Sequence, residues 1–237
     1  MTLRLRRDGG RYLRIGHRGA AALAPENTIA ALAAALAAGV DLIEIDVVAS
    51  EGPLRLAHSR EELESASPTA EDALSFFAAH APAEVGLLVD LKSPGAEVET
   101  IAALRSRDLV PRAALCSFFP DSLRTVRRLE PALATGLSYP LDRYALSRRA
   151  AVRPLVRPGL VALRSPLPLR IARMLRRAGA DAAVLHHLLV TPALVRRCHT
   201  LGAAVLAWTV TAPAELERIA AAGVDGVIAD DPRLFPS

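Results

Sequence analysis

Short apolar stretches alternate with longer stretches rich in alanine, leucine and arginine along the whole chain. The short stretches are typical of buried strands and the longer ones of helices, because strands are brief and helices need several turns. This alternation predicts β–α units arranged around a parallel sheet. The expected strands are Leu13–His17, Leu42–Val47, Gly86–Lys92, Ala113–Ser117, Thr135–Tyr139, Ala182–His186, Ala204–Thr209 and Gly226–Ala229.

Eight such units in 237 residues predict the α/β class and a (β/α)8 TIM barrel. A doubly wound sheet with helices on both faces is the alternative arrangement. Because 51% of the residues are hydrophobic, the chain can bury one large core, and we expect residues 1–237 to form a single domain. The stretch from Leu141 to Gly179 is long and contains several prolines, so an additional short helix or strand is expected there.

One expected helix has clear ends in the sequence. The segment Thr28–Ala38 consists almost entirely of residues that favour helix. Either Asn27 or Thr28 can cap its first turn, and Gly39 is placed to end it. The polar residues just before this helix are therefore expected to be held in a defined turn.

Charged residues interrupt two of the expected strands, and they follow the alternation of a strand. Glu44 and Asp46 share one face of the second strand, whereas the isoleucines and valine around them occupy the other face. Asp90 and Lys92 share a face of the third strand in the same way. In a barrel the apolar face packs against the helices, so these four side chains should point inward at the C-terminal rim, where active sites form.

Three acids that converge in this way need compensating positive charge. One interpretation is a buried ion-pair network of Glu44 or Asp90 with Lys92 and Arg18. The other is a divalent cation held by carboxylate oxygens, the ligands that both Mg²⁺ and Ca²⁺ favour. Lys92 is the single lysine among 29 basic residues, which is consistent with a position that needs a compact ammonium group.

Two histidines flank Glu44 and Asp46 in the sequence. His17 ends the first strand, and His58 ends the short extended run Leu54–His58. A single histidine in apolar surroundings is commonly structural, but two beside a group of acids can serve as general acid and general base near neutral pH. Arg18 and Lys92 then supply positive charge suited to a phosphate or an oxyanion.

The other histidines are interpreted from their places in the predicted elements. His80 and His199 fall in helices and are expected to be structural. The pair His186 and His187 closes a strand, so one of them could reach the mouth of the barrel.

Composition narrows the class of protein further. The net charge is +4 and the pI about 9.7, but the basic residues are spread along the chain and aromatic residues make up only 4%, which disfavours nucleic-acid binding. Cys116 and Cys198 have no metal-ligand spacing and are expected to be buried apolar groups. The sequence predicts neither a leader nor an integral membrane segment, so a cytoplasmic location is expected, and the oligomeric state is left open.

Several motifs in this order resemble the glycerophosphodiester phosphodiesterases. The resemblance extends over nearly the whole chain. It rests on Gly16-His17-Arg18-Gly19, Pro25-Glu26-Asn27-Thr28, Glu44-x-Asp46, Gly52 with His58, Asp90-x-Lys92, Ser117-Phe118, Ala207-Trp208-Thr209-Val210, and Gly223-Val224-Asp225-Gly226-Val227-Ile228-Ala229-Asp230-Asp231-Pro232.

The resemblance implies a metal-dependent TIM-barrel enzyme whose small-molecule phosphodiester substrate is cleaved to an alcohol and glycerol 3-phosphate. It implies a divalent metal, Mg²⁺ or Ca²⁺, with metal ligands, an acid/base pair, phosphate contacts and an apolar wall near the glycerol. Carried onto this sequence, the metal ligands would be Glu44, Asp46 and Asp90, and the acid/base pair would be His17 and His58. The phosphate contacts would be Arg18 and Lys92, and the apolar wall would be Phe118 and Trp208.

The chain departs from the family pattern at three places. Asp90 stands where the family usually has glutamate, and Ser59 stands where an aspartate usually follows the second histidine. The segment Ser59–Pro68 is much shorter than the usual insertion after the second strand, which helps to enclose the substrate. A more open site should accept bulkier substrates.

Two alternative functions follow from these departures. One is a lysophospholipase D-like phosphodiesterase, which apolar residues at the mouth of the barrel would support. The other is a barrel that binds a phosphorylated ligand without turning it over, for which two acid/base histidines would be unnecessary.

Overall fold

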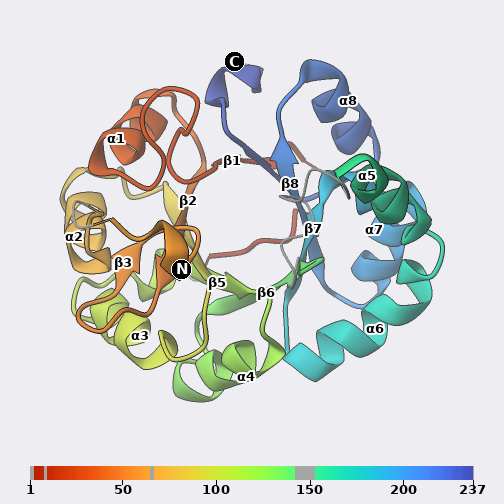
Figure 1. The fold of residues 1–237 in the computed structure, drawn as a ribbon. Helices are drawn as coiled ribbons and strands as arrows, with labels where there is room; N and C mark the ends of the chain where they lie inside the picture. Colours follow the sequence, from red (N-terminus) through yellow and green to blue (C-terminus); the bar gives the residue numbers. More distant parts are fainter. Residues whose placement is uncertain (1–2, 8–9, 65–66, 142–152, 237) are drawn as a thin grey trace.

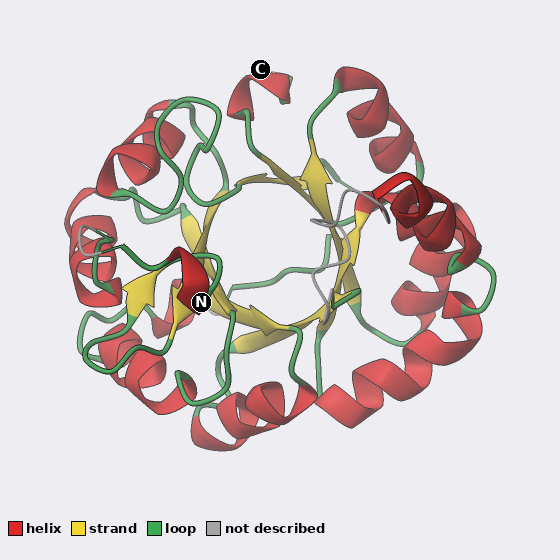
Figure 2. Cartoon of the chain, in the orientation of Figure 1, coloured by secondary structure: helices red, strands yellow, loops and turns green. Residues whose placement is uncertain are grey.

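The computed structural model describes residues 3–7, 10–64, 67–141 and 153–236 of the chain. Its parallel strands form a closed barrel in the order β1-β9-β8-β7-β6-β5-β4-β2, and the pairing of β1 with β2 completes the circle (Figures 1 and 2). The predicted (β/α)8 TIM barrel is therefore confirmed. The strands are β1 (Leu13–Gly16), β2 (Leu42–Val48), β4 (Gly86–Leu91), β5 (Ala113–Ser117), β6 (Ala134–Tyr139), β7 (Ala182–His186), β8 (Ala204–Val210) and β9 (Gly226–Ala229).

Helices surround the barrel on its outer side (Figure 2). They are α1 (Ile29–Ala37), α2 (Ala70–His80), α3 (Glu97–Arg105), α4 (Pro120–Leu129), α5 (Arg153–Ala162), α6 (Leu167–Ala178), α7 (Pro192–Thr200) and α8 (Pro213–Ala221). Helix α5 is the additional helix expected between Leu141 and Gly179. None of the helices in the described ranges combines the length and the apolar character needed to cross a membrane.

A short excursion separates β2 from α2. The two-residue strand β3 (Arg55–Leu56) pairs antiparallel with the end of β2, and the 3-10 helix η1 (Arg60–Glu62) follows it. This small unit brings His58 to the rim of the barrel, because His58 lies between β3 and η1.

Strand alternation divides the apolar side chains into two sets. Side chains such as Ile43, Ile45 and Val89 pack outward against the helices. Leu42, Leu88 and their equivalents on the other strands fill the barrel interior. The predicted inward face of β2 and β4 is therefore confirmed, and the acids of these strands lie on it.

The turn before α1 uses its two polar residues differently. Thr28 caps the helix, because its hydroxyl accepts a hydrogen bond from the backbone N–H of Ala31 at 3.2 Å. Asn27 instead faces the barrel and bonds to Asp46. Thr28 thus caps the helix, while its neighbour Asn27 contacts Asp46 inside the barrel.

Gly19 allows this turn to pass close to α1. Its φ is +86°, in the region that favours glycine, and an added Cβ would lie 2.5 Å from the backbone carbonyl carbon of Ala31. We expect Gly19→Ala to lower the free energy of unfolding by at least about 2 kcal/mol, from backbone strain and overpacking together. Urea denaturation measures this loss.

Gly39 provides the matched control for that substitution. Its φ is +69°, but an added Cβ would meet no atom within 4 Å. Gly39→Ala should therefore cost only the strain of a left-handed backbone, about 1 kcal/mol. Equal losses in the two variants would show that the contact with α1 does not constrain Gly19.

Candidate active site

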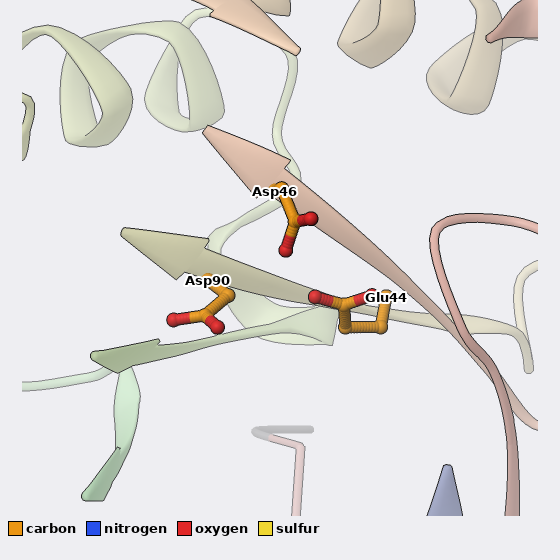
Figure 3. A group of neighbouring side chains, drawn as sticks. All are labelled: Glu44, Asp46 and Asp90. Carbon is orange, nitrogen blue, oxygen red and sulfur yellow. The ribbon is translucent and has the colours of Figure 1, made fainter. Parts of the chain in front are cut away.

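Three buried carboxylates meet inside the barrel at its C-terminal end. Glu44 and Asp46 come from β2 and Asp90 from β4, where Asp46 and Asp90 are direct neighbours in the strand register. One oxygen of each lies within 4.8 Å of the others, and the side chains converge from the two adjacent strands (Figure 3). The strand alternation thus brings together the acids that the sequence predicted.

Two cationic side chains contact this triad. The Nζ of Lys92 lies 2.7 Å from Asp46 Oδ1 and 2.5 Å from Asp90 Oδ2. The Nε of Arg18 lies 2.9 Å from Asp46 Oδ2, while its Nη1 donates to Glu26 at 2.6 Å. Part of the ion-pair network that the sequence suggested is therefore present.

Backbone and amide groups fix the orientation of the two acids on β2. The amide group of Asn27 donates to Asp46 Oδ2 at 3.1 Å, and its oxygen accepts the backbone N–H of Asp46 at 3.0 Å. The backbone N–H of Arg18 donates to Glu44 Oε2 at 2.8 Å. Arg18 and Asn27 have φ values of 49° and 56°, so the turn holds both residues in a costly conformation at the site.

The pKa values of the three acids diverge. Burial, together with the charge of Asp46, raises the pKa of Glu44 well above its ordinary value. Burial also raises the pKa of Asp90, although Lys92 opposes the shift. For Asp46 burial is outweighed by Lys92 and Arg18, which hold its pKa well below the usual range.

The triad fits a divalent cation. Its donors are hard carboxylate oxygens, and Asp90 Oδ1 is buried without a hydrogen-bond partner in the described part of the chain. Lys92 pairs with Asp46 and Asp90, and Arg18 pairs with Asp46, whereas none of these three ion pairs includes Glu44. A bound cation would supply the missing positive charge.

His17 lies beside the triad, and one of its ring nitrogens pairs with a further carboxylate. Its Nδ1 is 2.5 Å from Asp230 Oδ1, and its Nε2 is 4.0 Å from Glu44 Oε2. The hydrogen bond to His17 lowers the pKa of Asp230 although burial opposes the shift, so this carboxylate stays ionised near neutral pH. Asp230 therefore orients the imidazole and directs Nε2 toward the acids.

Asp230 was missing from the predicted site residues. It directly follows β9, at the end of the barrel where functional side chains gather. Its position one residue beyond a barrel strand, within the motif that ends in Asp230-Asp231-Pro232, was the signal that could have identified it.

His58 faces the same space from the segment between β3 and η1. Its Nδ1 lies 3.6 Å from Glu62 Oε2, and about a third of its side chain is exposed. Burial and the charges of Lys92 and Arg18 lower its pKa, so the neutral imidazole prevails at neutral pH. His58 is thus able to accept a proton.

A cavity of about 680 Å³ joins these groups. Its walls include His17, Arg18, Glu44, His58, Asp90, Lys92, Phe118 and Trp208, so the predicted acid/base, phosphate and apolar-wall residues share one space. Phe118 and Trp208 meet edge to face with ring centroids 6.0 Å apart, and Lys92 lies 5.7 Å from the Phe118 ring.

His186 also lines this cavity, whereas its neighbour His187 is buried. His186 packs against Trp208, and its Nδ1 accepts the backbone N–H of Leu188 at 3.2 Å, which leaves Nε2 as the protonated nitrogen. Burial and His187 lower the pKa of His186 to about 4. His186 is therefore a neutral hydrogen-bond donor at the mouth.

The remaining histidines and both cysteines have local partners or are buried. His80 bonds the Phe76 carbonyl within α2, and His199 pairs with buried Asp225 at 2.8 Å; neither histidine lines the cavity. Cys116 and Cys198 are free and buried, as expected.

Comparison with known proteins identifies similar sequences over most of the chain. Residues 17–58 and 54–234 match the model of the glycerophosphoryl diester phosphodiesterase family. A glycerophosphodiester phosphodiesterase of Caldanaerobacter subterraneus subsp. tengcongensis is 30% identical over 254 aligned positions, which cover 92% of this chain and 93% of that protein.

Solved structures show the same architecture. A protein of Silicibacter pomeroyi assigned as a glycerophosphoryl diester phosphodiesterase superposes with a TM-score of 0.75 at 26% identity, over 97% of this chain and 93% of that one. A phosphodiesterase of Oleispira antarctica, solved with the product sn-glycerol-3-phosphate, shares the fold with a TM-score of 0.68 at 22% identity, over 93% and 94% of the two chains.

Proposed function

Because this chain belongs to the glycerophosphoryl diester phosphodiesterase family, we propose that it hydrolyses glycerophosphodiesters to an alcohol and glycerol 3-phosphate by histidine acid/base chemistry beside a divalent cation. The enzyme is a phosphoric diester hydrolase. The observation that carries the mechanism is the placement of His17, held by Asp230, next to the buried triad and in the same cavity as His58.

The triad Glu44, Asp46 and Asp90 would hold Mg²⁺ or Ca²⁺. When bound, the cation lowers the charge on the phosphoryl oxygens and makes a coordinated hydroxyl more acidic. Lys92 and Arg18 add fixed positive charge for the phosphate, although each also neutralises part of the triad.

The reaction proceeds in two steps with exchanged proton roles. One histidine takes the proton of the substrate's own 2-hydroxyl as its oxygen attacks phosphorus, and the other protonates the oxygen of the departing alcohol. The bond from phosphorus to the alcohol breaks and a cyclic phosphate results. Water then opens the ring with the roles of His17 and His58 reversed, which yields glycerol 3-phosphate.

Phe118 and Trp208 would form the apolar wall beside the glycerol carbons. Trp208 is fixed there because its indole N–H donates to the carbonyl of Val184 at 3.1 Å. A rigid wall next to the reacting hydroxyl favours the conformation in which that hydroxyl can reach phosphorus.

Release of glycerol 3-phosphate from glycerophosphocholine and glycerophosphoethanolamine tests this function. We expect turnover in Mg²⁺ or Ca²⁺, loss of at least about 100-fold in excess EDTA, and recovery when the cation is restored. The same assay with His17→Ala should show a comparable or larger loss.

Each result separates the alternatives. Full turnover in EDTA after dialysis would remove the metal from the mechanism, and full activity of His17→Ala would remove the acid/base role of that residue. Binding of glycerol phosphate without turnover of any diester would instead support a phosphate-binding barrel.

A further inference from the structure

His186 offers the active-site cavity a hydrogen-bond donor that the proposed reaction does not use. Because its Nδ1 accepts the backbone N–H of Leu188, the proton of the neutral ring lies on Nε2. Among the described residues Nε2 has no hydrogen-bond partner, and His186 lines the cavity. This N–H group is therefore available to a bound ligand.

Two arginines hold the turn that follows His186. Arg164 donates through Nε to the carbonyl of Leu188 at 2.5 Å, and Arg218 donates through Nη2 to the carbonyl of His187 at 3.1 Å. The ring of His187 lies against that of His186, with centroids 4.7 Å apart. These contacts fix the backbone and the imidazole, so the donor is held in place before a ligand binds.

His186 lies across the barrel from the acidic triad. In the closed strand order β7 is opposite β2, the strand that carries two of the three acids (Figure 1). Lys92 lies 5.7 Å from the Phe118 ring, and Phe118 meets Trp208. Trp208 is in turn the register neighbour of His186, with ring centroids 5.1 Å apart. The cavity wall therefore leads from Lys92 past two aromatic rings to His186.

A glycerophosphodiester bound as proposed would extend along this wall. Its phosphate belongs beside the triad and Lys92, and its glycerol carbons belong against Phe118 and Trp208. The 2-hydroxyl has to stay close to phosphorus because it attacks there. The terminal hydroxyl is thus the group of the glycerol farthest from the phosphate, on the side of the wall where His186 lies.

We propose that His186 donates a hydrogen bond through Nε2 to the terminal hydroxyl of the substrate's glycerol, and that this contact is a determinant of specificity. The inference rests on the proposed function, which puts the phosphate at the opposite end of the wall. The terminal hydroxyl takes no part in the bond changes at phosphorus. Its contact with His186 holds the glycerol in the orientation that the attack of the 2-hydroxyl requires.

His186 also has a structural contact, the bond from the Leu188 N–H to its Nδ1. His186→Asn separates the two roles. Asparagine keeps a side-chain acceptor for a backbone N–H two residues on, but it is too short to place a donor where Nε2 lies. This variant should retain the turn and lose the proposed contact with the substrate.

The experiment measures kcat/KM for release of choline from glycerophosphocholine and from 2-hydroxypropyl phosphocholine. The second compound lacks only the terminal hydroxyl and keeps the 2-hydroxyl that attacks. We expect the wild type to favour glycerophosphocholine at least about tenfold, because without that hydroxyl the N–H of His186 has no partner. In His186→Asn the ratio of the two values should fall to about one.

The ratio is independent of the fraction of enzyme that is folded, since both substrates meet the same preparation. His80→Asn is the matched control, because His80 is exposed on α2 and does not line the cavity. It should keep the wild-type ratio of kcat/KM values.

The possible outcomes distinguish this inference from the proposed function. Equal kcat/KM for the two compounds in the wild type, with glycerophosphocholine hydrolysed, would overturn the inference and leave the proposed function standing. A wild-type preference that persists in His186→Asn would show that another group reads the hydroxyl, which also overturns the inference. Failure of the wild type to hydrolyse either diester would overturn the proposed function and the inference with it.

Discussion

Replacing Glu44 by glutamine is expected to lower kcat/KM for glycerophosphocholine at least about 10³-fold. Glutamine keeps the size of the side chain but removes one of the three negative charges that would hold the cation. Stabilisation of the reacting phosphate by a metal is worth several kcal/mol, and every 1.4 kcal/mol corresponds to a factor of ten. Steady-state kinetics across a range of Mg²⁺ and Ca²⁺ concentrations measures the loss.

The same substitution should not destabilise the protein in EDTA. The pKa of Glu44 is raised in the folded state, so its ionised form opposes folding at pH values above the unfolded pKa. Glutamine removes this cost, and the melting temperature in EDTA should stay equal to that of wild type or rise. The increase in melting temperature that the cation gives to wild type should be lost.

Glu217→Gln on α8 is the matched control, because the residue is exposed on the outer side of the barrel. It should retain wild-type kinetics and the wild-type response to metal. A Glu44→Gln enzyme that is still stabilised by the cation and still active would show that Asp46 and Asp90 suffice as ligands, which would contradict the role given to Glu44.

The barrel and its acidic triad could be predicted because both depend on local periodicity. Alternation along one strand decides that Glu44 and Asp46 share a face, and the same rule applied to the next strand adds Asp90 and Lys92. The strand boundaries followed from apolar stretches and differ from the structure by a residue or less. These features need no knowledge of how distant segments meet.

Contacts between segments that are distant in the sequence could not be predicted in this way. The pairing of His17 with Asp230 joins residues 213 positions apart, and only closure of the barrel through β1 and β9 brings them together. Asn27 was an equal candidate for the helix cap, and its bond to Asp46 depends on the left-handed turn that only the structure displays.

Helix α5 shows a further limit of local reasoning. Its sequence contains Pro154 and Pro158, which weaken a helical pattern, so the segment was expected only as an unspecified short element. The apolar lining that α5 gives to the cavity depends on where the helix lies relative to β7. That placement depends on tertiary packing, so the apolar part of the cavity could not be predicted from the sequence.

A second large loss of activity is expected when either member of the pair formed by His17 and Asp230 is replaced. His17→Ala should lower kcat about 10²- to 10⁴-fold, the usual contribution of a general acid or base. Asp230→Asn should lower kcat about 10²-fold with little change in KM, because Asp230 holds the imidazole and is not among the described residues that line the cavity. Asp231→Asn is the control, since Asp231 pairs with exposed Arg233, and its kinetics should remain close to wild type.

The double variant, which combines His17→Ala with Asp230→Asn, decides whether Asp230 acts through His17. If its sole contribution is to orient and stabilise the imidazole, Asp230→Asn should add almost nothing once His17 is alanine, and the two losses should be strongly non-additive. A residue that merely supported the fold would lower activity by the same factor in both backgrounds and would lower the melting temperature as well. If the two losses of kcat multiply in the double variant, the positioning role of Asp230 is contradicted. If the double variant has the same kcat as His17→Ala, the carboxylate of Asp230 must act through the imidazole nitrogen that it contacts.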